Sequence, residues 1–438
     1  MSDLKAYILF PGAAKNPLYS GWLERLNVPA EIVKDYDTNW LPPDDAGIVI
    51  THNHYRWEEL SILRSIVEKT SVPLLILVDG ILEYRNSFEH PGLADGSMFQ
   101  PLIGHKLACI GASQIRWIES FGNAGKCELT GLPRLDDLVG AEKREPQTEE
   151  PLRLLVATAR TPWFNDEQRT VVYRGMNAIK ESLDATEQID GRPINVQWRM
   201  SKELHDNLQA PGFIARPGPI RDVLDQVDAV ITTPSTLQLE AAALGIPVAV
   251  VDFHNSPQMT PMAWRIAHES DVQEVIKELA APPPAKMLAQ DVLLHDALQL
   301  QQPAADRMVT LVDEMVKQGR EARQENRPLI FPDRILSHPT NGFADAQPAG
   351  TTERLFPDNP VFLNAEVHRL QTELSAAIHE MGNYPEKFFQ QRTANQKLRG
   401  YVNWLRLVIR NRAARVEELK TTIQNLQAQD HDRPVNEN

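Results

Sequence analysis

Short apolar segments alternate with amphipathic segments along most of the chain. Residues 6–10, 47–51, 73–78 and 106–111 are apolar and bounded by Gly, Pro or Asp, which is typical of buried strands. Residues 57–68 and 113–121 have helical spacing, with Ser113 expected as an N-cap. Buried strands separated by helices form parallel sheets covered on both faces, so the pattern predicts an α/β fold.

The same pattern begins again after a charged segment with two prolines, residues 140–151, which we interpret as a linker. The second set has expected strands at 152–159, 194–198, 228–233 and 247–253, and expected helices at 166–183, 220–226, 237–244 and 270–279. We therefore predict two Rossmann-like, doubly wound domains. They span residues 1–145 and 151–325, and the second includes a helix at 304–324.

The last quarter of the chain has a different composition. Residues 326–362 are rich in Pro, Gly and Thr and are predicted to be a linker, and residues 363–430 form a predicted helical tail, either a short coiled coil or a helical pair. Residues 384–415 carry eight Lys or Arg and one acidic residue. Two interpretations of this basic segment stay open. It lies on an anionic membrane surface, or it packs on the acidic core or on a second subunit.

Composition excludes several classes of function. A net charge of −14 argues against nucleic-acid binding. The two cysteines, Cys109 and Cys127, are too few for a disulfide scaffold or a four-cysteine zinc site, and they fit a reducing compartment. No apolar stretch reaches the ~20 residues of a membrane span. We expect a cytoplasmic protein whose membrane contact, if it has one, is peripheral at the inner face.

The segment 228–253 contains the most informative pattern. A buried strand ends at Thr232 and Thr233, Pro234 follows, and Ser235 and Thr236 precede a helix. Backbone N–H groups at such a helix start, together with two hydroxyls, can hold a phosphate or diphosphate. The carboxylate of Glu240, one turn later, can accept hydrogen bonds from a ribose diol. The alternative is an ordinary N-cap with an acid favoured by the helix dipole.

These residues resemble the donor-binding region of GT-B fold transferases, in which a run of the type D-x-x-[IV]-x-x-x-S-x-x-x-x-E-[AV]-x-x-x-G-x-P-V recurs. Asp228, Ser235, Glu240 and Gly245 match the run. The resemblance implies that Ser235 and Thr236 contact the donor diphosphate and that Glu240 contacts the ribose. The chain departs from the pattern where many members carry a Gly-rich loop and it has Thr-Pro.

A second segment, T-G-L-P-R-L-D at residues 130–136, resembles the end of the N-terminal domain in CDP-glycerol glycerophosphotransferases and in relatives of lipid-A-disaccharide synthase. The resemblance makes Arg134 a candidate cleft residue. Taken alone, the segment is also compatible with a tight Gly-Pro turn flanked by surface charges. Its position about 100 residues before Ser235 favours the functional interpretation.

Asp79 and Gly80 follow a predicted strand at the place where the glycerophosphotransferase relatives have His-Gly. Because parallel α/β sheets bind ligands beyond the carboxyl ends of their strands, Asp79 is positioned to deprotonate an acceptor hydroxyl. The alternative is a turn in which Asp79 caps and Gly80 supplies flexibility. The replacement of His by Asp favours sugar transfer over glycerophosphate transfer.

Weaker candidates lie in three further loops. His52 and His54 follow a strand, but they have no evident third metal ligand, so we predict no metal and give His54 a donor or acceptor contact. Thr158 and Arg160 follow the first strand of the second domain, and an arginine suits bidentate phosphate binding. The turn at residues 216–220, with Gly218, is where similar proteins hold the nucleobase.

The sequence predicts a metal-independent glycosyltransferase that moves a sugar from a nucleotide-activated donor to a hydroxyl acceptor, a glycan or a lipid-linked glycan, in cell-surface polysaccharide synthesis. The chain contains neither a phosphate-binding loop of the Walker type nor a G-x-G-x-x-G fingerprint, so we expect no cofactor. Two alternatives stay open. One is a nucleotide-sugar 2-epimerase of the same fold, and the other is a non-catalytic scaffold that kept the fold.

Overall fold

The computed structural model describes residues 4–94, 96–100, 102–144, 151–210 and 218–337, and these residues belong to one compact unit. Most of the predicted linker at 326–362 and the whole predicted tail at 363–430 lie outside the described residues. The two interpretations of the basic segment at 384–415 therefore stay predictions. Among the described helices, none is long and apolar enough to cross a bilayer.

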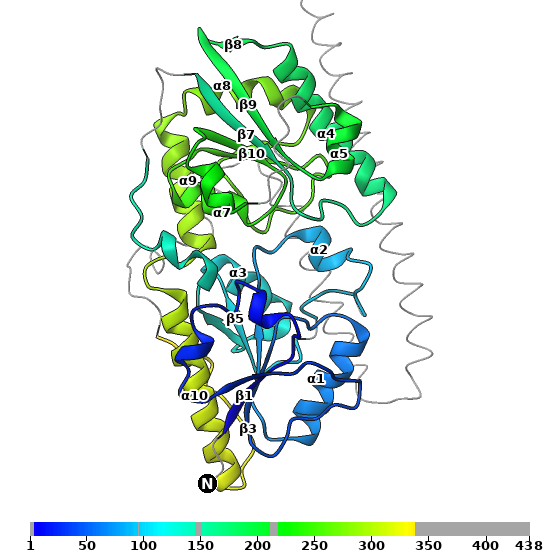
Figure 1. Ribbon diagram of the computed structural model, residues 1–438, viewed down its shortest axis with the longest axis vertical. Helices are drawn as coiled ribbons and strands as arrows, with labels where there is room; N and C mark the ends of the chain where they lie inside the picture. Colours follow the sequence, from blue (N-terminus) through cyan, green and yellow to red (C-terminus); the bar gives the residue numbers. More distant parts are fainter. Residues whose placement is uncertain (1–3, 95, 101, 145–150, 211–217, 338–438) are drawn as a thin grey trace, which may run out of the picture. The chain divides into compact units, whose positions relative to one another are not determined.

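The first sheet has six parallel strands in the order β2-β1-β3-β4-β5-β6 (Figure 1). Its strands are β1 (Lys5–Ile8), β2 (Ala30–Ile32), β3 (Ala46–Thr51), β4 (Leu74–Leu77), β5 (Lys106–Cys109) and β6 (Cys127–Leu129). Its helices are α1 (Trp57–Lys69), α2 (Tyr84–Phe88) and α3 (Ala112–Ile118), with short helical turns η1 (Ala13–Lys15), η2 (Leu23–Arg25), η3 (Glu119–Asn123) and η4 (Pro133–Leu138). The central strands are buried on both faces, as their continuous apolar sequences predict.

The second sheet has the order β12-β11-β10-β7-β9-β8, parallel except for the short edge strand β8. Its strands are β7 (Leu152–Ala157), β8 (Gln188–Ile189), β9 (Arg192–Arg199), β10 (Ala229–Thr232), β11 (Val248–Val251) and β12 (Trp264–Ile266). Its helices are α4 (Asp166–Asp184), α5 (Lys202–Leu208), α6 (Ile220–Leu224), α7 (Leu237–Ala243), α8 (Val272–Ala280) and α9 (Pro284–Ala297), with a short turn η5 (Glu269–Asp271) before α8.

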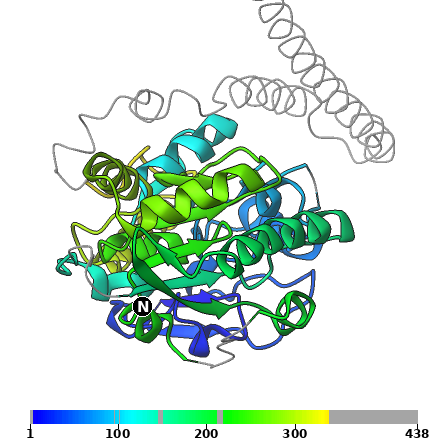
Figure 2. The ribbon, with the colours of Figure 1, turned by 90° about the horizontal axis from the view of Figure 1, so that it is seen from above.

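Helices cover both faces of the second sheet, which can be followed from above in Figure 2. Apolar side chains of α4 and α8 pack on one face, and those of α6 and α7 pack on the other. The predicted fold class, two Rossmann-like α/β domains, is therefore confirmed. The helix at 166–183 is also correct, because α4 starts at Asp166 and the side chain of Asn165 accepts the N–H of Gln168 at 2.8 Å.

Two local predictions were wrong. The N-cap of α3 is Gly111 and not Ser113, because the chain needs a residue without a side chain there: a Cβ on Gly111 would lie 2.1 Å from the carbonyl oxygen of Ala297. Helix α9 was missed, because its neighbouring prolines suggest a break. Pro284 occupies the first turn of α9, where a missing N–H costs nothing.

The chain returns to the first sheet at its last described helix, α10 (Ala304–Gln324). Helix α10 was expected at these residues, but the sequence grouped it with the second domain, whereas it packs against β3 and η4. Before it, α9 packs against both α7 and α3. The domain boundaries drawn from the sequence stay predictions.

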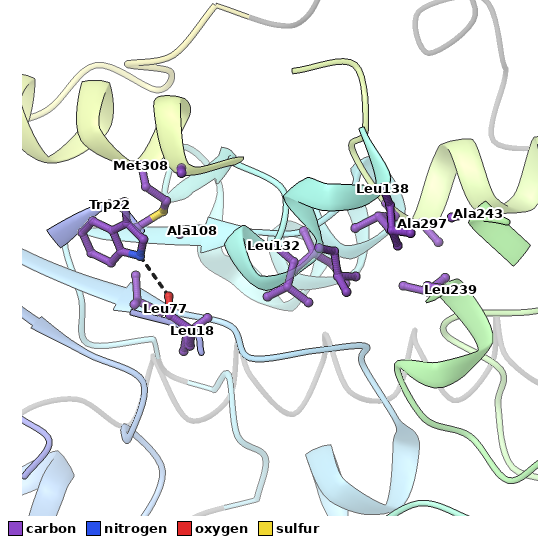
Figure 3. Packing of buried hydrophobic residues seen from close by; sticks show 14 of the residues in the cluster. Leu18, Trp22, Leu77, Ala108, Leu132, Leu138, Leu239, Ala243, Ala297 and Met308 are labelled. Atoms are coloured by element: carbon purple, nitrogen blue, oxygen red, sulfur yellow. Dashed lines mark hydrogen bonds between the residues drawn. The ribbon is translucent and has the colours of Figure 1, made fainter. Parts of the chain in front are cut away.

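One hydrophobic cluster joins the two sheets (Figure 3). Trp22, fully buried, lies near Met308 of α10 and donates its indole N–H to the carbonyl of Leu18 at 2.9 Å. Farther along the same cluster, Leu132 and Leu138 of the η4 region pack toward α7 and α9. Because the core is continuous, a change in the η4 region affects both sheets.

A buried ion pair fixes the chain after α10 to the edge of the first sheet. The Lys106 ammonium is 2.8 Å from the Glu128 carboxylate, and the two side chains are 1% and 0% exposed. The ammonium also donates to the carbonyls of Gly125, Pro332 and Asp333. The carboxylate accepts the N–H groups of two more residues of that segment, Ile335 and Leu336. Every strong polar group of this pair is therefore satisfied without water.

We expect Glu128→Gln to lower the free energy of unfolding by about 3–5 kcal/mol, because it leaves the Lys106 charge buried and unpaired. Urea denaturation of the full chain measures this loss. Glu314→Gln is the matched control, since the Lys317–Glu314 pair at 3.4 Å is largely exposed and should change stability by less than about 1 kcal/mol. Equal effects of the two variants would contradict the role given to the buried pair.

Candidate functional site

Each sheet has a point at which the strand order reverses. In the first sheet it lies between β1 and β3, and in the second between β7 and β10. Ligands of open α/β sheets bind beyond the carboxyl ends of the strands at such points, because the neighbouring loops diverge there. In the second sheet the loops at this point begin with Thr158 and Thr233, so the topology places the predicted donor residues at the expected edge.

A threonine hydroxyl ties these two loops together. Thr233, 3% exposed, accepts the backbone N–H of Ala159 at its hydroxyl oxygen at 2.7 Å, and its own N–H donates to the carbonyl of Ala157 at 3.3 Å. A glycine at this position could not make the hydroxyl contact. The departure from a Gly-rich loop therefore fixes the loop after β7 against the loop after β10.

Ser235 and Thr236 lie between β10 and α7, as predicted. Thr236 is the residue before α7, and its side chain makes no capping hydrogen bond. The hydroxyl of Ser235 lies 3.3 Å from that of Thr232. Helix α7 has only seven residues, so its dipole is weaker than the sequence interpretation assumed. The hydroxyl groups and nearby arginines therefore matter more than the dipole for holding an anion here.

Glu240 and Arg134 come together although they are 106 residues apart. The Arg134 guanidinium donates to the Glu240 carboxylate at 2.7 Å, and the two side chains are 27% and 11% exposed. The sequence interpretation gave Glu240 to a ribose and Arg134 to the cleft, without pairing them. A ribose hydroxyl at Glu240 would have to share or replace the contact with Arg134.

The other residues of the T-G-L-P-R-L-D segment have structural roles. Gly131 has a φ of +86°, and a Cβ on it would lie 3.0 Å from the carbonyl oxygen of Gln299. The Asp136 carboxylate accepts the N–H groups of Ala304 and Ala305 at 2.6 and 2.9 Å, which caps α10. Within this motif, Arg134 is thus the member that contacts a predicted site residue.

Asp79 and Gly80 follow β4 and lie beside the loop of the second sheet. Asp79 is exposed, whereas Gly80 is buried. A Cβ on Gly80 would lie 2.4 Å from the hydroxyl oxygen of Thr236, so the two loops are in close contact and a larger residue at position 80 would displace the Thr236 side chain. The structure therefore brings the predicted base and the predicted diphosphate loop to the same place.

The switch point of the first sheet is surrounded by aromatic rings and histidines. His52, just after β3, has its Nδ1 2.9 Å from the Tyr19 hydroxyl, and its ring meets the edge of Phe10 with centroids 4.3 Å apart. Burial lowers the pKa of His52, whereas the charge of Asp79 opposes this change. His52 is partly accessible, whereas the sequence interpretation gave the donor or acceptor contact to His54.

His54 is buried, with 4% of its surface exposed. Its ring packs against Phe99 with centroids 5.2 Å apart, and its Nδ1 lies 3.2 Å from the carbonyl oxygen of His52. Burial lowers the pKa of His54 to about 4. A direct contact of His54 with a donor or acceptor stays a prediction, and it would require the covering side chains to move.

The remaining donor candidates lie at the ends of β7 and β9. Arg160 is exposed, and Thr158 donates its N–H to the carbonyl of Arg199 at 3.1 Å. Arg199, which the sequence interpretation missed, donates to the carbonyl of Gly218 at 2.9 Å and has a second, buried nitrogen without a partner among the described residues. Residues 211–217 lie outside the described residues, so of the predicted nucleobase turn at 216–220 the structure describes Gly218 and the two residues after it.

Comparison of the sequence with protein-family models and with curated proteins finds no match. Similar solved structures include the wall teichoic acid polymerase TagF, with 11% identity, a TM-score of 0.44, and coverage of 73% of this chain and 90% of that one. They also include a putative UDP-N-acetylglucosamine 2-epimerase from Listeria monocytogenes, with 13% identity, a TM-score of 0.48, and coverage of 76% and 100%. The UDP-GlcNAc 2-epimerase of Methanocaldococcus jannaschii has 13% identity, a TM-score of 0.47, and coverage of 71% and 100%. The fold assignment rests on the two sheets themselves.

The buried His54 predicts a pH dependence of stability. Its pKa in the folded chain, about 4, lies below its ordinary value of 6.5, so between these values the unfolded chain binds the proton more strongly. Stability should therefore be lost as pH falls from about 6.5 to 4, by up to about 3 kcal/mol from this group. Urea denaturation at a series of pH values should show a shallower slope for His54→Gln. The exposed-residue variant His268→Gln should keep the slope of the unmodified chain.

Proposed function

We propose that the chain is a nucleotide-sugar enzyme, and specifically a glycosyltransferase that transfers a sugar from a nucleoside-diphosphate donor to a hydroxyl acceptor. The observation that carries this proposal is the close approach of Gly80, which follows Asp79, to Thr236, which follows Ser235, in loops after strands of two different sheets. A donor diphosphate and an acceptor hydroxyl have to come within reach of each other, and this contact supplies residues suited to each.

The second sheet is the proposed donor side. Ser235 and Thr236 offer hydroxyl groups to the diphosphate, whereas the N–H of Ser235 already donates to the side-chain oxygen of Gln238 at 3.3 Å. Thr158 and Arg160 extend from the neighbouring loop. The hydroxyl oxygen of Thr158 is buried and has no partner among the described residues, which leaves it free to donate to a ligand oxygen. Arg160 is exposed and matches the planar, bidentate geometry of phosphate oxygens.

Glu240 is the proposed ribose contact. Its carboxylate is nearly buried and holds a single arginine, Arg134, at 2.7 Å. A carboxylate oxygen has more than one lone pair, so Glu240 can accept a ribose hydroxyl while it also accepts from Arg134. Arg134 then acts as a positioning residue for Glu240 and is itself available to a nearby phosphate oxygen.

Asp79 is the proposed base. It takes the proton of the acceptor hydroxyl as that oxygen attacks the anomeric carbon, and the bond from this carbon to the diphosphate breaks. The negative charge that develops on the leaving diphosphate is stabilised by the loop N–H groups and by Arg160. His52 belongs to the same edge and can orient the acceptor hydroxyl through its ring. The protein would act in cell-surface polysaccharide or glycoconjugate synthesis, at the cytoplasmic side of the membrane.

A nucleotide-sugar 2-epimerase is the second candidate. Asp79 and His52 are close enough to interact electrostatically, and an epimerase needs proton transfer without an acceptor. A scaffold protein that kept the fold is the third. A scaffold has no need of the buried, unpartnered hydroxyl of Thr158 or of the close approach of Gly80 to Thr236. These two features favour a ligand-binding edge.

We expect Glu240→Ala to weaken the binding of a nucleoside diphosphate by about tenfold or more, because a buried hydrogen bond to a charged group is lost. Isothermal titration of the full chain with UDP, GDP and CDP measures the affinity and selects the base. Glu167→Gln, an exposed carboxyl on α4, is the matched control and should bind as the unmodified chain does. An unchanged affinity in Glu240→Ala would remove the ribose assignment.

Mass spectrometry can separate transfer from isomerisation. With the nucleotide sugar that binds, the glycosyltransferase is expected to release nucleoside diphosphate only when a hydroxyl acceptor is present, and Asp79→Asn should slow this release by about 100-fold or more. Formation of an isomer of the donor without any acceptor would instead establish the epimerase. If no nucleotide binds in the titrations above, the scaffold is favoured.

A further inference from the structure

A recess at the carboxyl end of β11 holds polar groups that neither the sequence motifs nor the proposed mechanism uses. It opens beside the first half of α4 and is bounded by Thr233, which also forms part of the diphosphate loop. Its lining residues are Arg85, Val171, Val172, Gly175, Thr233, Val251, Asp252, Phe253 and His254. The walls from α4 and β11 are apolar, and three of the lining side chains, those of Arg85, Asp252 and His254, can carry a charge.

Asp252 is the most deeply buried of these polar side chains, with 4% of its surface exposed. One carboxylate oxygen, Oδ2, accepts the N–H of Ser256 at 3.0 Å and lies 3.8 Å from the Arg265 guanidinium. The other, Oδ1, is buried and has no partner among the described residues. Burial raises the pKa of this carboxyl, against the lowering effect of Arg85 and Arg265. An unsatisfied oxygen of this kind is costly, so it indicates a partner that the chain itself does not supply.

His254 presents a second unsatisfied atom two residues later. Its Nε2 is buried and lacks a partner among the described residues. Burial, together with the charges of Arg85 and Arg174, lowers the pKa of His254 to about 4. The imidazole is therefore neutral at pH 7, where one ring nitrogen donates a hydrogen bond and the other accepts one.

Arg85 reaches the recess from α2, a helix of the first sheet's half of the molecule. It is 5% exposed, and its Nε donates to the Glu83 carboxylate at 2.6 Å. One terminal nitrogen donates to the carbonyl of Pro162, at 3.0 Å. Two further contacts, from Gln168 to Glu89 and from Thr260 to the carbonyl of Leu82, fix the same segment to the second half. The guanidinium charge of Arg85 is thus paired with the Glu83 carboxylate.

We propose that this recess binds one hydroxyl of an uncharged, polyhydroxylated ligand. Asp252 and His254, which line the recess together with Arg85, recognise this hydroxyl. A hydroxyl can donate its proton to the free oxygen of Asp252 and accept a hydrogen bond from the Nε2–H of His254. One hydroxyl therefore satisfies both atoms. A phosphate is disfavoured there, because its negative charge would meet the buried carboxylate of Asp252.

The identity of that group rests on the proposed function. Thr233 lines the recess and also orders the diphosphate loop, so a donor bound at Ser235 and Thr236 would direct the group beyond its diphosphate toward Asp252. That group is the one transferred. Because Arg85 belongs to the other half of the molecule, the recess is complete only while the contacts of residues 82–90 with the second half are made. Selection among transferred groups would then depend on those contacts.

The test uses the full chain with its histidines labelled with ¹³C at Cε1, and His254→Gln assigns the signal of His254. N-acetylglucosamine, glycerol and inorganic phosphate are titrated separately at pH 7.5. We expect a saturable shift of the His254 signal with N-acetylglucosamine or glycerol and none with phosphate. Asp252→Asn should weaken this binding by about tenfold or more, because an amide nitrogen or an uncharged oxygen replaces the acceptor. Glu167→Gln is the matched control and should behave as the unmodified chain does.

The outcomes separate this inference from the proposed function. If neither polyhydroxylated probe shifts the His254 signal at tens of millimolar while UDP or CDP still binds, water alone fills the recess and the inference is wrong. If phosphate shifts the signal as strongly as the sugar does, the site is an anion site and the inference is also wrong. If the sugar shifts the His254 signal but no nucleotide binds, the hydroxyl site at the recess is supported and the proposal of a nucleotide-sugar donor is wrong. The unmodified chain decides these cases even where Asp252→Asn fails to fold.

Discussion

The rest of the structure depends on the contact of the turn between α9 and α10 with the first sheet. Its Gln299 donates its backbone N–H to the carbonyl of Ile110 at 2.8 Å and its side-chain amide to the carbonyl of Thr130 at 3.2 Å. The carbonyl of Ala297, at the end of α9, approaches Gly111 so closely that no side chain fits there. The turn is thereby inserted at the carboxyl ends of β5 and β6, and α9 and α10 are held on either side of it.

This insertion explains why one apolar core serves both sheets. Helix α9 covers α7, and α10 covers β3, so the residues that pack on each helix are joined through η4. It also explains why a segment that resembles a functional motif is largely structural. Gly131 and Asp136 hold the turn, and the same short stretch of chain presents Arg134 to Glu240. A local contact of the scaffold and a candidate site contact are therefore mechanically linked.

The electrostatics of the candidate site follow from burial more than from net charge. The chain is acidic overall, with a net charge of −14, yet the pKa of each group at the two sheet edges depends on its own surroundings. Burial lowers the pKa of His52 and His254 and raises that of Asp252, so at neutral pH these histidines are uncharged hydrogen-bonding groups. Groups with perturbed pKa values often cluster at ligand-binding sites, and they occur here at both sheet edges.

The sequence by itself determined the central strands and most of the helices, because short apolar runs and helical spacing report burial directly. It missed the strands β2, β6, β8 and β12, which have only two or three residues each and so too short a pattern to recognise. It placed Asp79, Thr158 and Ser235 after strands and so at sheet edges, and Glu240 in the helix that follows Ser235. It misjudged α9, since Pro284 suits a first helical turn as well as a break.

Tertiary structure alone decided which of these residues meet. The pairing of Arg134 with Glu240, the contact of Gly80 with Thr236, and the approach of Arg85 to Asp252 all join residues more than 100 positions apart. Local patterns contain no information on such distant partners, because the strand order and the return of α10 to the first sheet fix them. Thus the sequence identified candidate residues for each sheet separately. The packing of the turn between α9 and α10 placed the carboxyl-end edges of the two sheets next to each other.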